Sequence, residues 1–455
     1  MSIRANKRIV NYKTIKFILK YLHEGVLKPT SKAFLFAYIY VVLPKLIDHL
    51  IVSIKKKRWN DISPRFMKVI LNAFHPNKFP VFAASLVAGI NILEPIVYAI
   101  FKKHSLFKIP TRSIFFATLI SSFISAAISF PRFQNHILGY GRYYSLDLTL
   151  LVVTRALDTA LSSSLSVIMP HYISRFGDVA LFIASCTPIM FAWFYTPEKL
   201  PPAYRNWITS AANMDDELIE ALRRLRDGSL VYGEHGPYET ILLPICERHN
   251  QDPSRASLIV HQPVECELVH EFKTKNCEIH ALWRFVRGFS FAIKLYGPLN
   301  VLVLLFPAKG SKFSARVIRA MKASVRSSVF LGAYISLYWY AVCLSRSRLL
   351  PYLFPKKPRT DFDITIGPSA GAFLCGFSSL IETAQRRKEL ALFVAPRALG
   401  TFVPTEASKI NLKIESLVFS VSLAVLVAYS RSDPSKVRGI FGKGLKQVFN
   451  IGSYN

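Results

Sequence analysis

The sequence predicts an all-α polytopic membrane protein, made of two repeated helical bundles with a small soluble insert between them. The 455-residue chain is 51% hydrophobic and has a mean hydropathy of +0.29, and only 19% of its residues are charged. Soluble domains usually carry about 25% charged residues. The net charge is nevertheless +30, which is expected when apolar segments alternate with basic loops that contact anionic lipid headgroups.

An internal repeat is the third observation behind this fold class. Leu148–Thr159 reads LTLLVVTRALDT and Leu390–Thr401 reads LALFVAPRALGT, with seven of twelve positions identical at an offset of 242 residues. One shared residue is an arginine, Arg155 and Arg397, which apolar composition does not predict. A period this long does not fit a solenoid and suggests two halves of one membrane protein. Chance similarity between two apolar helices is the alternative.

The N-terminal part of the chain predicts two membrane-associated elements. Residues 1–33 form a basic amphipathic segment, a pattern typical of helices that lie on a membrane or target an organelle. Residues 34–54 are apolar and long enough to cross a bilayer, which takes about 20 residues. They contain Pro44, Lys45 and Asp48, however, so we expect this segment to lie in the interface.

Eight stronger apolar segments predict transmembrane helices, four in each half. They are residues 80–101, 113–130, 146–168, 179–196, 328–345, 364–381, 389–405 and 412–430.

Residues 288–307 resemble the first interfacial segment, because they carry Lys294 and Pro298. If both interfacial segments stay out of the hydrocarbon there are eight crossings and the halves run parallel. If both span, there are ten crossings and the halves are inverted. The charged residues in them favour eight.

The predicted organisation therefore has five parts. They are the basic amphipathic segment (1–33), the first membrane repeat (34–196), a soluble insert containing Cys and His (197–287), the second membrane repeat (288–431) and a basic tail (432–455).

The insert contains the strongest candidate for site chemistry. Cys266, His270, Cys277 and His280 follow the pattern C-x3-H-x6-C-x2-H. Thiolate and imidazole are the ligands that Zn²⁺ prefers, and four of them close a tetrahedral structural site. The spacing is not that of a standard zinc finger. Three interpretations therefore stay open: polar residues at the membrane edge, a structural zinc or similar metal, and a redox-active pair formed by Cys266 and Cys277.

Five ionisable residues fall within or beside the predicted spans: Glu94, Arg155, Asp158, Glu382 and Arg397. A charge at the bilayer centre costs roughly 2.5–3.5 kcal/mol, so such residues usually face the bundle interior and pair. Asp158 follows Arg155 by three residues on one helix face, which indicates a local pair or part of a polar pathway. The second copy lacks an acid at that position. We therefore expect Arg397 to reach another helix, with Glu382 as the nearest partner and Asp158 as the alternative.

Three glycines predict close helix packing in the second half. Gly367 and Gly371 form a GxxxG motif, and Gly376 follows it. Small residues at this spacing let helix backbones approach closely in lipid.

Two long blocks resemble a known family. The block CELVHEFKTKNCEIHALWRFVRGFSFAIKLYGPL resembles the Cys/His-rich segment of the transmembrane protein 135 family, in its fungal branch, and GAFLCGFSSLIETAQRRKELALFVAPRALGTF resembles the second repeat of that family. The resemblance covers most of residues 30–450. The family is distantly similar to mitochondrial inner-membrane translocase channels and to peroxisomal four-helix membrane proteins. Animal members carry a further Cys/His cluster near the N-terminus, whereas this chain has no Cys before Cys186.

The resemblance implies a peroxisomal or mitochondrial membrane and a role in lipid handling or organelle shape. The first functional hypothesis is an integral organelle membrane protein, involved in lipid homeostasis or organelle dynamics, that moves lipid-like or small solutes. The second is a non-transporting scaffold that recruits partners through the 197–287 insert. Neither hypothesis is an enzyme, and no residue is predicted to be catalytic. Expected partners are membrane lipids, further copies of the chain or other organelle membrane proteins, and not nucleic acid.

Overall fold

The computed structural model describes residues 16, 18–55, 62–104, 109–137, 145–168, 176–236, 238–304, 312–358, 360–437 and 439–449. Residues 1–15 and 17 of the predicted basic segment 1–33 lie outside these residues, as do residues 438 and 450–455 of the tail 432–455. Every regular element in the described part is a helix, which confirms the predicted all-α class. The chain divides into two compact units. Unit 1 comprises Met1–Pro170 and Pro404–Asn455, and unit 2 comprises His171–Val403.

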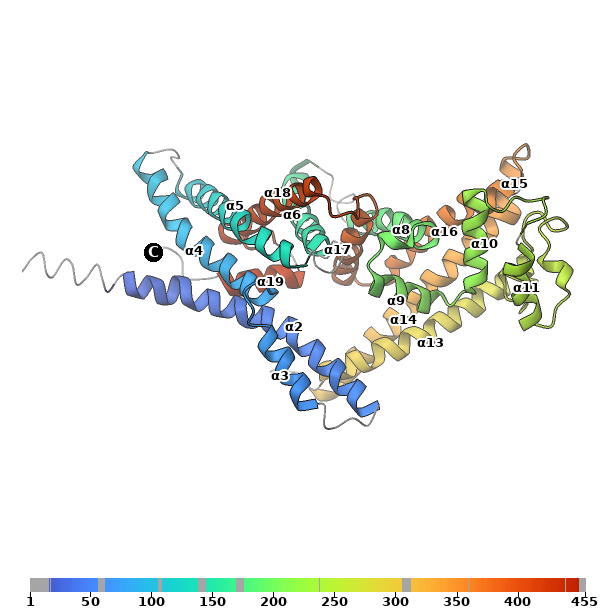
Figure 1. Cartoon of the computed structure of the whole chain (residues 1–455), viewed down its shortest axis with the longest axis horizontal. Coiled ribbons are helices and arrows are strands. Elements are labelled where there is room, and N and C mark those ends of the chain that lie inside the picture. The colour runs from blue at the N-terminus through green and yellow to red at the C-terminus, as the bar shows by residue number, and fades with distance from the viewer. Residues whose placement is uncertain are drawn as a thin grey trace, which may run out of the picture. The chain divides into compact units, whose positions relative to one another are not determined.

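Unit 1 is held together by an aromatic core. Phe130 of α5 stacks on Phe419 of α18 with ring centroids 4.1 Å apart, and Phe82 of α4 stacks on Phe133 at 4.7 Å. Helix α18 packs against both α5 and α6, and α4 packs against α2 and α5 (Figure 1). The described helices of unit 1 are η1 (Leu22–Leu27), α2 (Lys28–Lys55), α3 (Ile62–Asn72), α4 (Phe79–Lys103), α5 (Pro110–Ile137), α6 (Ser145–Ile168), α18 (Lys409–Ser432) and α19 (Gly439–Phe449).

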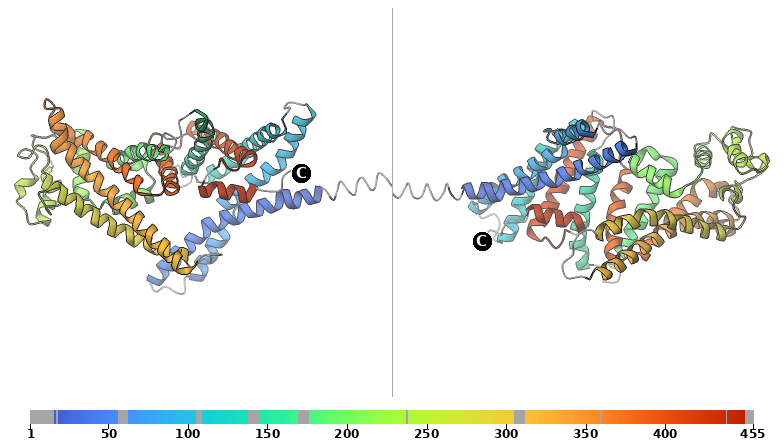
Figure 2. Two further views of the ribbon diagram at one scale, coloured as in Figure 1. Left: turned by 180° about the vertical axis from the view of Figure 1, so that it is seen from behind. Right: turned by 90° about the horizontal axis from the view of Figure 1, so that it is seen from below.

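Unit 2 is organised around the hairpin of α13 and α14 (Figure 2). The two helices run antiparallel, because Ser336 donates to the Ala281 carbonyl (2.7 Å) at one end and Asn300 donates to Ser324 (3.0 Å) nearer the other. The main helices of this unit are α8 (Gly177–Tyr195), α9 (Pro202–Ala212), α10 (Asp216–Asp227), α11 (Tyr238–Arg248), α12 (Cys266–Val269), α13 (Cys277–Leu304), α14 (Phe313–Leu344), α15 (Leu350–Leu353), α16 (Gly367–Cys375) and α17 (Ala384–Gly400).

One helix of each predicted half packs in the other unit. Helix α8 follows α6 in the chain but packs against α16 and α17 in unit 2, whereas α18 follows α17 but packs against α5 and α6 in unit 1. The compact units therefore differ from the predicted segments 34–196 and 288–431. An apolar segment buries its surface equally well against either set of helices, so composition does not specify the partner. The two copies of the repeated stretch have corresponding neighbours, α6 against α18 and α17 against α8.

Seven helices in the described part are long and apolar enough to cross a membrane. They are Ile18–Ile54, Phe79–Lys103, Arg112–Asn135, Gly177–Tyr195, Phe313–Leu353, Phe362–Ile381 and Lys409–Ser432. Six match predicted spans, and the first contains the segment expected to lie in the interface. Helix α17, which carries the second copy of the repeated stretch, has only 17 residues and is not among them.

Large apolar side chains are exposed along the candidate spans. Tyr40 on α2 is 74% exposed and Ile410 on α18 is 70% exposed. Extended apolar surface of this kind is unusual on a soluble monomer and marks contact with a membrane or partner. The protein is thus a helical membrane protein.

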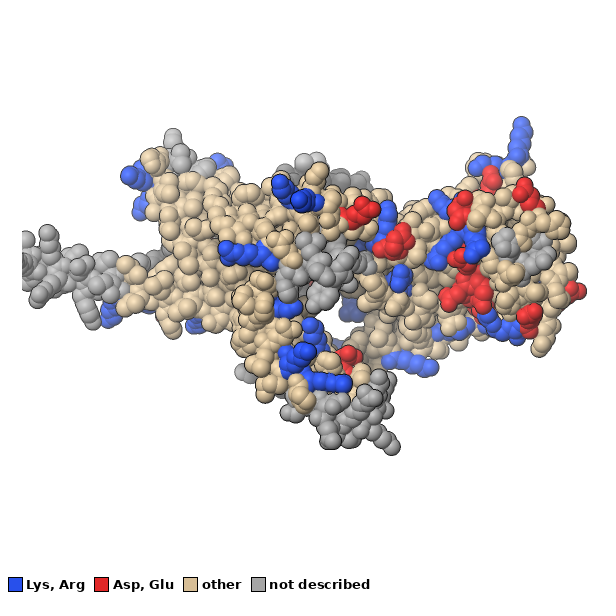
Figure 3. All heavy atoms as spheres, viewed as in Figure 1, with Lys and Arg blue, Asp and Glu red and all other residues tan. Residues whose placement is uncertain are grey.

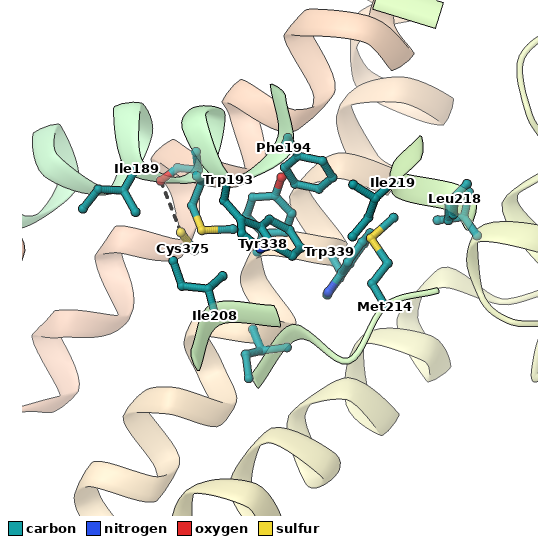
Figure 4. Packing of buried hydrophobic residues seen from close by; sticks show 14 of the residues in the cluster. Ile189, Trp193, Phe194, Ile208, Met214, Leu218, Ile219, Tyr338, Trp339 and Cys375 are labelled. Atoms are coloured by element: carbon teal, nitrogen blue, oxygen red, sulfur yellow. Dashed lines mark hydrogen bonds between the residues drawn. The ribbon is translucent and has the colours of Figure 1, made fainter. Parts of the chain in front are cut away.

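The predicted insert shares one core with the membrane helices of unit 2. Met214 and Ile219 lie beside Phe194 and Trp339 in a single buried cluster (Figure 4). The predicted boundary at residue 287 falls in the middle of α13, which continues unbroken from Cys277 to Leu304. The insert is therefore a cap built onto the bundle, and its residues 277–287 belong to a bundle helix.

The predicted glycines allow close approach at two helix crossings. A Cβ atom at Gly371 would lie 2.9 Å from the carbonyl oxygen of Tyr338 on α14, and one at Gly376 would lie 2.9 Å from the Cα of Ile183 on α8. Gly367 faces a carbonyl of the preceding turn instead, 2.7 Å from its Cβ position. Any side chain at Gly371 or Gly376 would push these helices apart.

Candidate functional site

A cavity of about 460 Å³ lies inside unit 2, between helices α8, α9, α13, α14 and α17. Its wall is largely apolar and aromatic, and includes Trp193, Trp207, Tyr334 and Trp339. Small-molecule sites in proteins are typically concave, mostly apolar and about 300–1,000 Å³ in volume. The cavity therefore has the size and lining of a ligand site.

Helix α9 of the insert forms one wall of this cavity. It begins at the second of two consecutive prolines, Pro202, and is followed by Asn213, which adopts the left-handed conformation. The indole of Trp193 on α8 donates to Thr209 on α9 (3.0 Å). Arg223 on α10 donates to the carbonyls of Trp193 and Phe194, which satisfies groups that the end of a helix leaves without partners. The insert is thus tied directly to the end of α8.

Arg397 supplies a cationic side chain to the cavity lining. It is half-buried, and its guanidinium lies 4.9 Å from the ring centroid of Tyr204 and 3.8 Å from that of Phe393. Glu382, the expected partner, is buried and accepts a hydrogen bond from Ser327 (2.6 Å), and its pairing with Arg397 stays a prediction. Asp158 as the alternative partner stays a prediction. A guanidinium at an apolar aromatic wall attracts an anionic group more strongly than it would in water.

The four predicted Cys/His residues do not converge as a set. The ligand atoms of His270 and Cys277 lie within 4.8 Å of each other, and the third atom of this group comes from Cys343 on α14. His280 stacks on His270 with ring centroids 4.1 Å apart and an interplanar angle of 15°. Because an imidazole lone pair lies in the ring plane, two parallel rings cannot both direct one to a metal about 2 Å away. Assigning His280 to the same metal as His270 was therefore wrong.

His280 belongs to a buried polar cluster centred on Arg284. The Nε of Arg284 donates to His280 Nε2 (3.1 Å), and its other nitrogens donate to Glu271 (2.9 Å) and to the carbonyls of Ala212 and Asn213 (both 3.0 Å). Burial, together with the neighbouring His270 and Arg284, lowers the pKa of His280 to about 3. His280 is thus a neutral acceptor. Arg284 joins α13 to the end of α9.

A second buried cluster ties the middle of the insert to the segments on either side of α15. Arg346 and Asp363 form an ion pair in which both side chains are almost fully buried. The hydroxyl of Tyr232 donates to Asp363 (2.7 Å), and Arg346 donates to the Val264 carbonyl. Burial and the Asp363 carboxylate raise the pKa of Tyr232, so this hydroxyl remains a donor. No local sequence pattern predicts this cluster, because its members are spread over more than one hundred residues.

Unit 1 contains the remaining predicted polar residues. Glu94 is buried, pairs with Arg431 of α18 (2.9 Å) and accepts from Thr118 (2.7 Å). Arg155 is buried and Asp158 is half-buried, and the two lie one turn apart on α6. The expected local pair between them stays a prediction.

Glu415 of α18 is a buried acid that was not among the predicted intramembrane charges. It accepts hydrogen bonds from Gln134, Ser145 (3.0 Å) and Thr149 (2.9 Å). The sequence feature that could have identified it is its position within the predicted apolar span 412–430. These contacts fix α18 to both α5 and α6.

Comparison of the chain with protein-family models, curated proteins and solved structures found no match.

Proposed function

We propose that this protein is an organelle membrane protein that binds lipid-like amphiphiles in the unit 2 cavity and takes part in lipid homeostasis by moving them. The observation that carries the proposal is a mostly apolar, aromatic cavity among candidate membrane spans, with Arg397 in its lining. Its volume is in the lower half of the range for small-molecule sites. These properties favour a single acyl chain with an anionic headgroup.

The membrane in which the protein acts is part of the same proposal. Resemblance to the transmembrane protein 135 family supports a peroxisomal or mitochondrial membrane. Fluorescent tagging of the full chain against markers of both organelles is the direct measurement. A signal confined to the plasma membrane or endoplasmic reticulum would contradict this assignment.

Filling the cavity should prevent amphiphile binding. Ala211 of α9 lines the cavity, and Ala211→Trp introduces an indole into it. We expect labelling of the purified full-length protein by a photoreactive fatty acid to fall about tenfold, which corresponds to about 1.4 kcal/mol of lost binding. Peptide mapping of the wild-type label should identify α9, α14 or α17.

The matched control is Ser210→Trp, because Ser210 is the preceding residue on the same helix and is exposed. This variant should be labelled like the wild type. Thermal unfolding of both variants identifies any general loss of structure. Equal labelling of Ala211→Trp and wild type, with both folded, would exclude the cavity as the binding site.

Arg397 should select for an anionic headgroup. Arg397→Leu removes the guanidinium from the lining, and we expect it to weaken binding of a fatty acid about tenfold, or about 1.4 kcal/mol. Binding of the methyl ester of the same acid should not change, because the ester carries no charge. Lys388→Leu, at an exposed position on the same helix, is the control. Equal losses for acid and ester would mean that Arg397 acts on the fold and not on the headgroup.

A scaffold is the second candidate function, and the surface of the insert favours it. Acidic and basic side chains gather over α10 and α11 (Figure 3), where Glu220 pairs with Arg224 and Asp215 pairs with Arg248. Deleting 197–287 does not separate the two functions, since α9 belongs to both the insert and the cavity wall. Exchanging Glu220 and Arg224 does, because a scaffold would lose its partners while amphiphile binding continued.

A further inference from the structure

Three cysteines and one histidine come together where the insert meets the α13–α14 hairpin. The ligand atoms of His270, Cys277 and Cys343 all lie within 4.8 Å of one another. They come from three places: the end of α12, the first residue of α13 and the last turn of α14. Around a tetrahedral Zn²⁺ with bonds of about 2.0–2.3 Å, neighbouring ligand atoms are about 3.5–3.8 Å apart. Small side-chain rotations bring the three atoms to that spacing.

His270 is held in the orientation of a metal ligand. Its Nδ1 lies 2.9 Å from the Thr274 carbonyl oxygen, and its Nε2 lies 3.4 Å from the sulfur of Cys343. Metal-binding histidines almost always donate the second ring N–H to a carbonyl or carboxylate, which fixes the tautomer and the ring. The Thr274 carbonyl therefore leaves the Nε2 lone pair directed at the thiol group.

The loop from His270 to Cys277 is stiffened by its own hydrogen bonds. The side chain of Thr274 accepts from the Asn276 amide (3.1 Å), and the Asn276 side chain accepts from the amides of Glu278 (2.8 Å) and Ile279 (3.2 Å) at the start of α13. A loop held in this way keeps the two ligands at a fixed separation and lowers the entropic cost of binding an ion.

Cys266 completes a set of four donors. Its thiol lies beside that of Cys277 and 3.2 Å from the Ser347 hydroxyl. As a metal ligand, Cys266 would exchange its contact with the Ser347 hydroxyl for a bond to the ion. The remaining cysteines of the chain, Cys186, Cys246 and Cys375, are buried in the apolar core, where a free thiol acts as a small hydrophobic side chain.

We propose that Cys266, His270, Cys277 and Cys343 bind one Zn²⁺ as a closed Cys₃His site. All four positions are filled by protein, so the ion is structural, and thiol protons are released to solvent when it binds. It joins α12 and the loop after it to the adjacent ends of α13 and α14. This proposal does not depend on the proposed function, because the site and the cavity share no residue.

The test is metal content and cobalt spectroscopy of the full-length protein purified in detergent without added metal. We expect one zinc per chain by elemental analysis. Replacement by Co²⁺ should give tetrahedral d–d absorption and thiolate-to-cobalt charge transfer. His270→Ala and Cys343→Ser should lose the metal. His270→Cys should retain it with an altered cobalt spectrum, because a fourth thiolate replaces the imidazole. That retention separates ligation from a purely structural role.

Two variants serve as matched controls, and both should keep one zinc. Cys246→Ser alters a buried thiol in the apolar core, and His280→Gln alters the histidine that the structure assigns to the Arg284 cluster. Wild-type protein with neither stoichiometric zinc nor cobalt charge transfer would overturn the proposal. A Cys266–Cys277 disulfide detected by mass spectrometry of unreduced protein would overturn it too. Loss of metal in His280→Gln with retention in Cys343→Ser would contradict the ligand assignment.

Discussion

Replacing Arg284 with leucine should lower the free energy of unfolding by about 3–5 kcal/mol, the effect typical of removing one partner from a buried ion pair. The Arg284 side chain is 2% exposed, and its donors reach Glu271, His280 and two carbonyls at the end of α9. Leucine provides no donor, so each of these acceptors would lose a hydrogen bond in a buried environment. Denaturant titration in mixed micelles measures the change.

Arg287→Leu is the control for this prediction. Arg287 lies on the same helix and approaches the same carboxylate of Glu271, but at 3.8 Å and with its side chain 38% exposed. Exposed pairs contribute about 0–1 kcal/mol, so this variant should unfold almost like the wild type. Similar losses for the two variants would show that net charge near Glu271, and not the buried hydrogen bonds of Arg284, sets the stability.

Glu94→Leu should have a comparable effect in unit 1, about 3–5 kcal/mol. Glu94 lies on a candidate membrane span, its side chain is 3% exposed, and it pairs with Arg431 of α18. Without Glu94, the guanidinium retains its contact with Asn91 but loses the opposite charge, in a region where water does not compensate it. We expect a large fall in unfolding free energy, whereas Glu406→Leu, at an exposed position, should change it little.

The double variant Glu94→Leu, Arg431→Leu gives the sharper test. Replacing both members of a buried pair with apolar residues is often neutral or stabilising. The double variant should therefore be more stable than Glu94→Leu alone. If the two losses simply added, the coupling energy would be zero and the pair would not hold α4 to α18.

The sequence was sufficient to predict the helices but not their partners. Long apolar runs identify α4, α5, α8 and α18, because a stretch of about 20 apolar residues has few stable alternatives in lipid. Which bundle a given run joins depends on contacts such as those of Glu94 and Glu415, which link residues more than 250 positions apart. Local patterns do not contain that information.

The candidate sites also depend on contacts that local sequence patterns do not specify. Spacing correctly brought His270 and Cys277 together, because a stiff loop joins them. It wrongly added His280, since ring stacking and the hydrogen bond from Arg284 direct that side chain elsewhere. It could not find Cys343, whose approach depends on the packing of α13 against α14. The cavity could not be predicted from the sequence either, because its wall comes from five separate helices.

The exchange of α8 and α18 gives the chain a direction of assembly. Unit 2 is one continuous stretch, His171–Val403, whereas unit 1 needs α18, which starts at Lys409. During synthesis from the N-terminus, unit 2 has all its helices once α17 has emerged. At that point α5 and α6 of unit 1 still lack their packing partner α18. Until α18 inserts, the Glu415 carboxylate is not available to the three residues that donate to it, Gln134, Ser145 and Thr149. Unit 1 is therefore completed only after α18 has been made. A chain whose synthesis stops before α18 would leave unit 1 open, with polar groups that quality control could recognise.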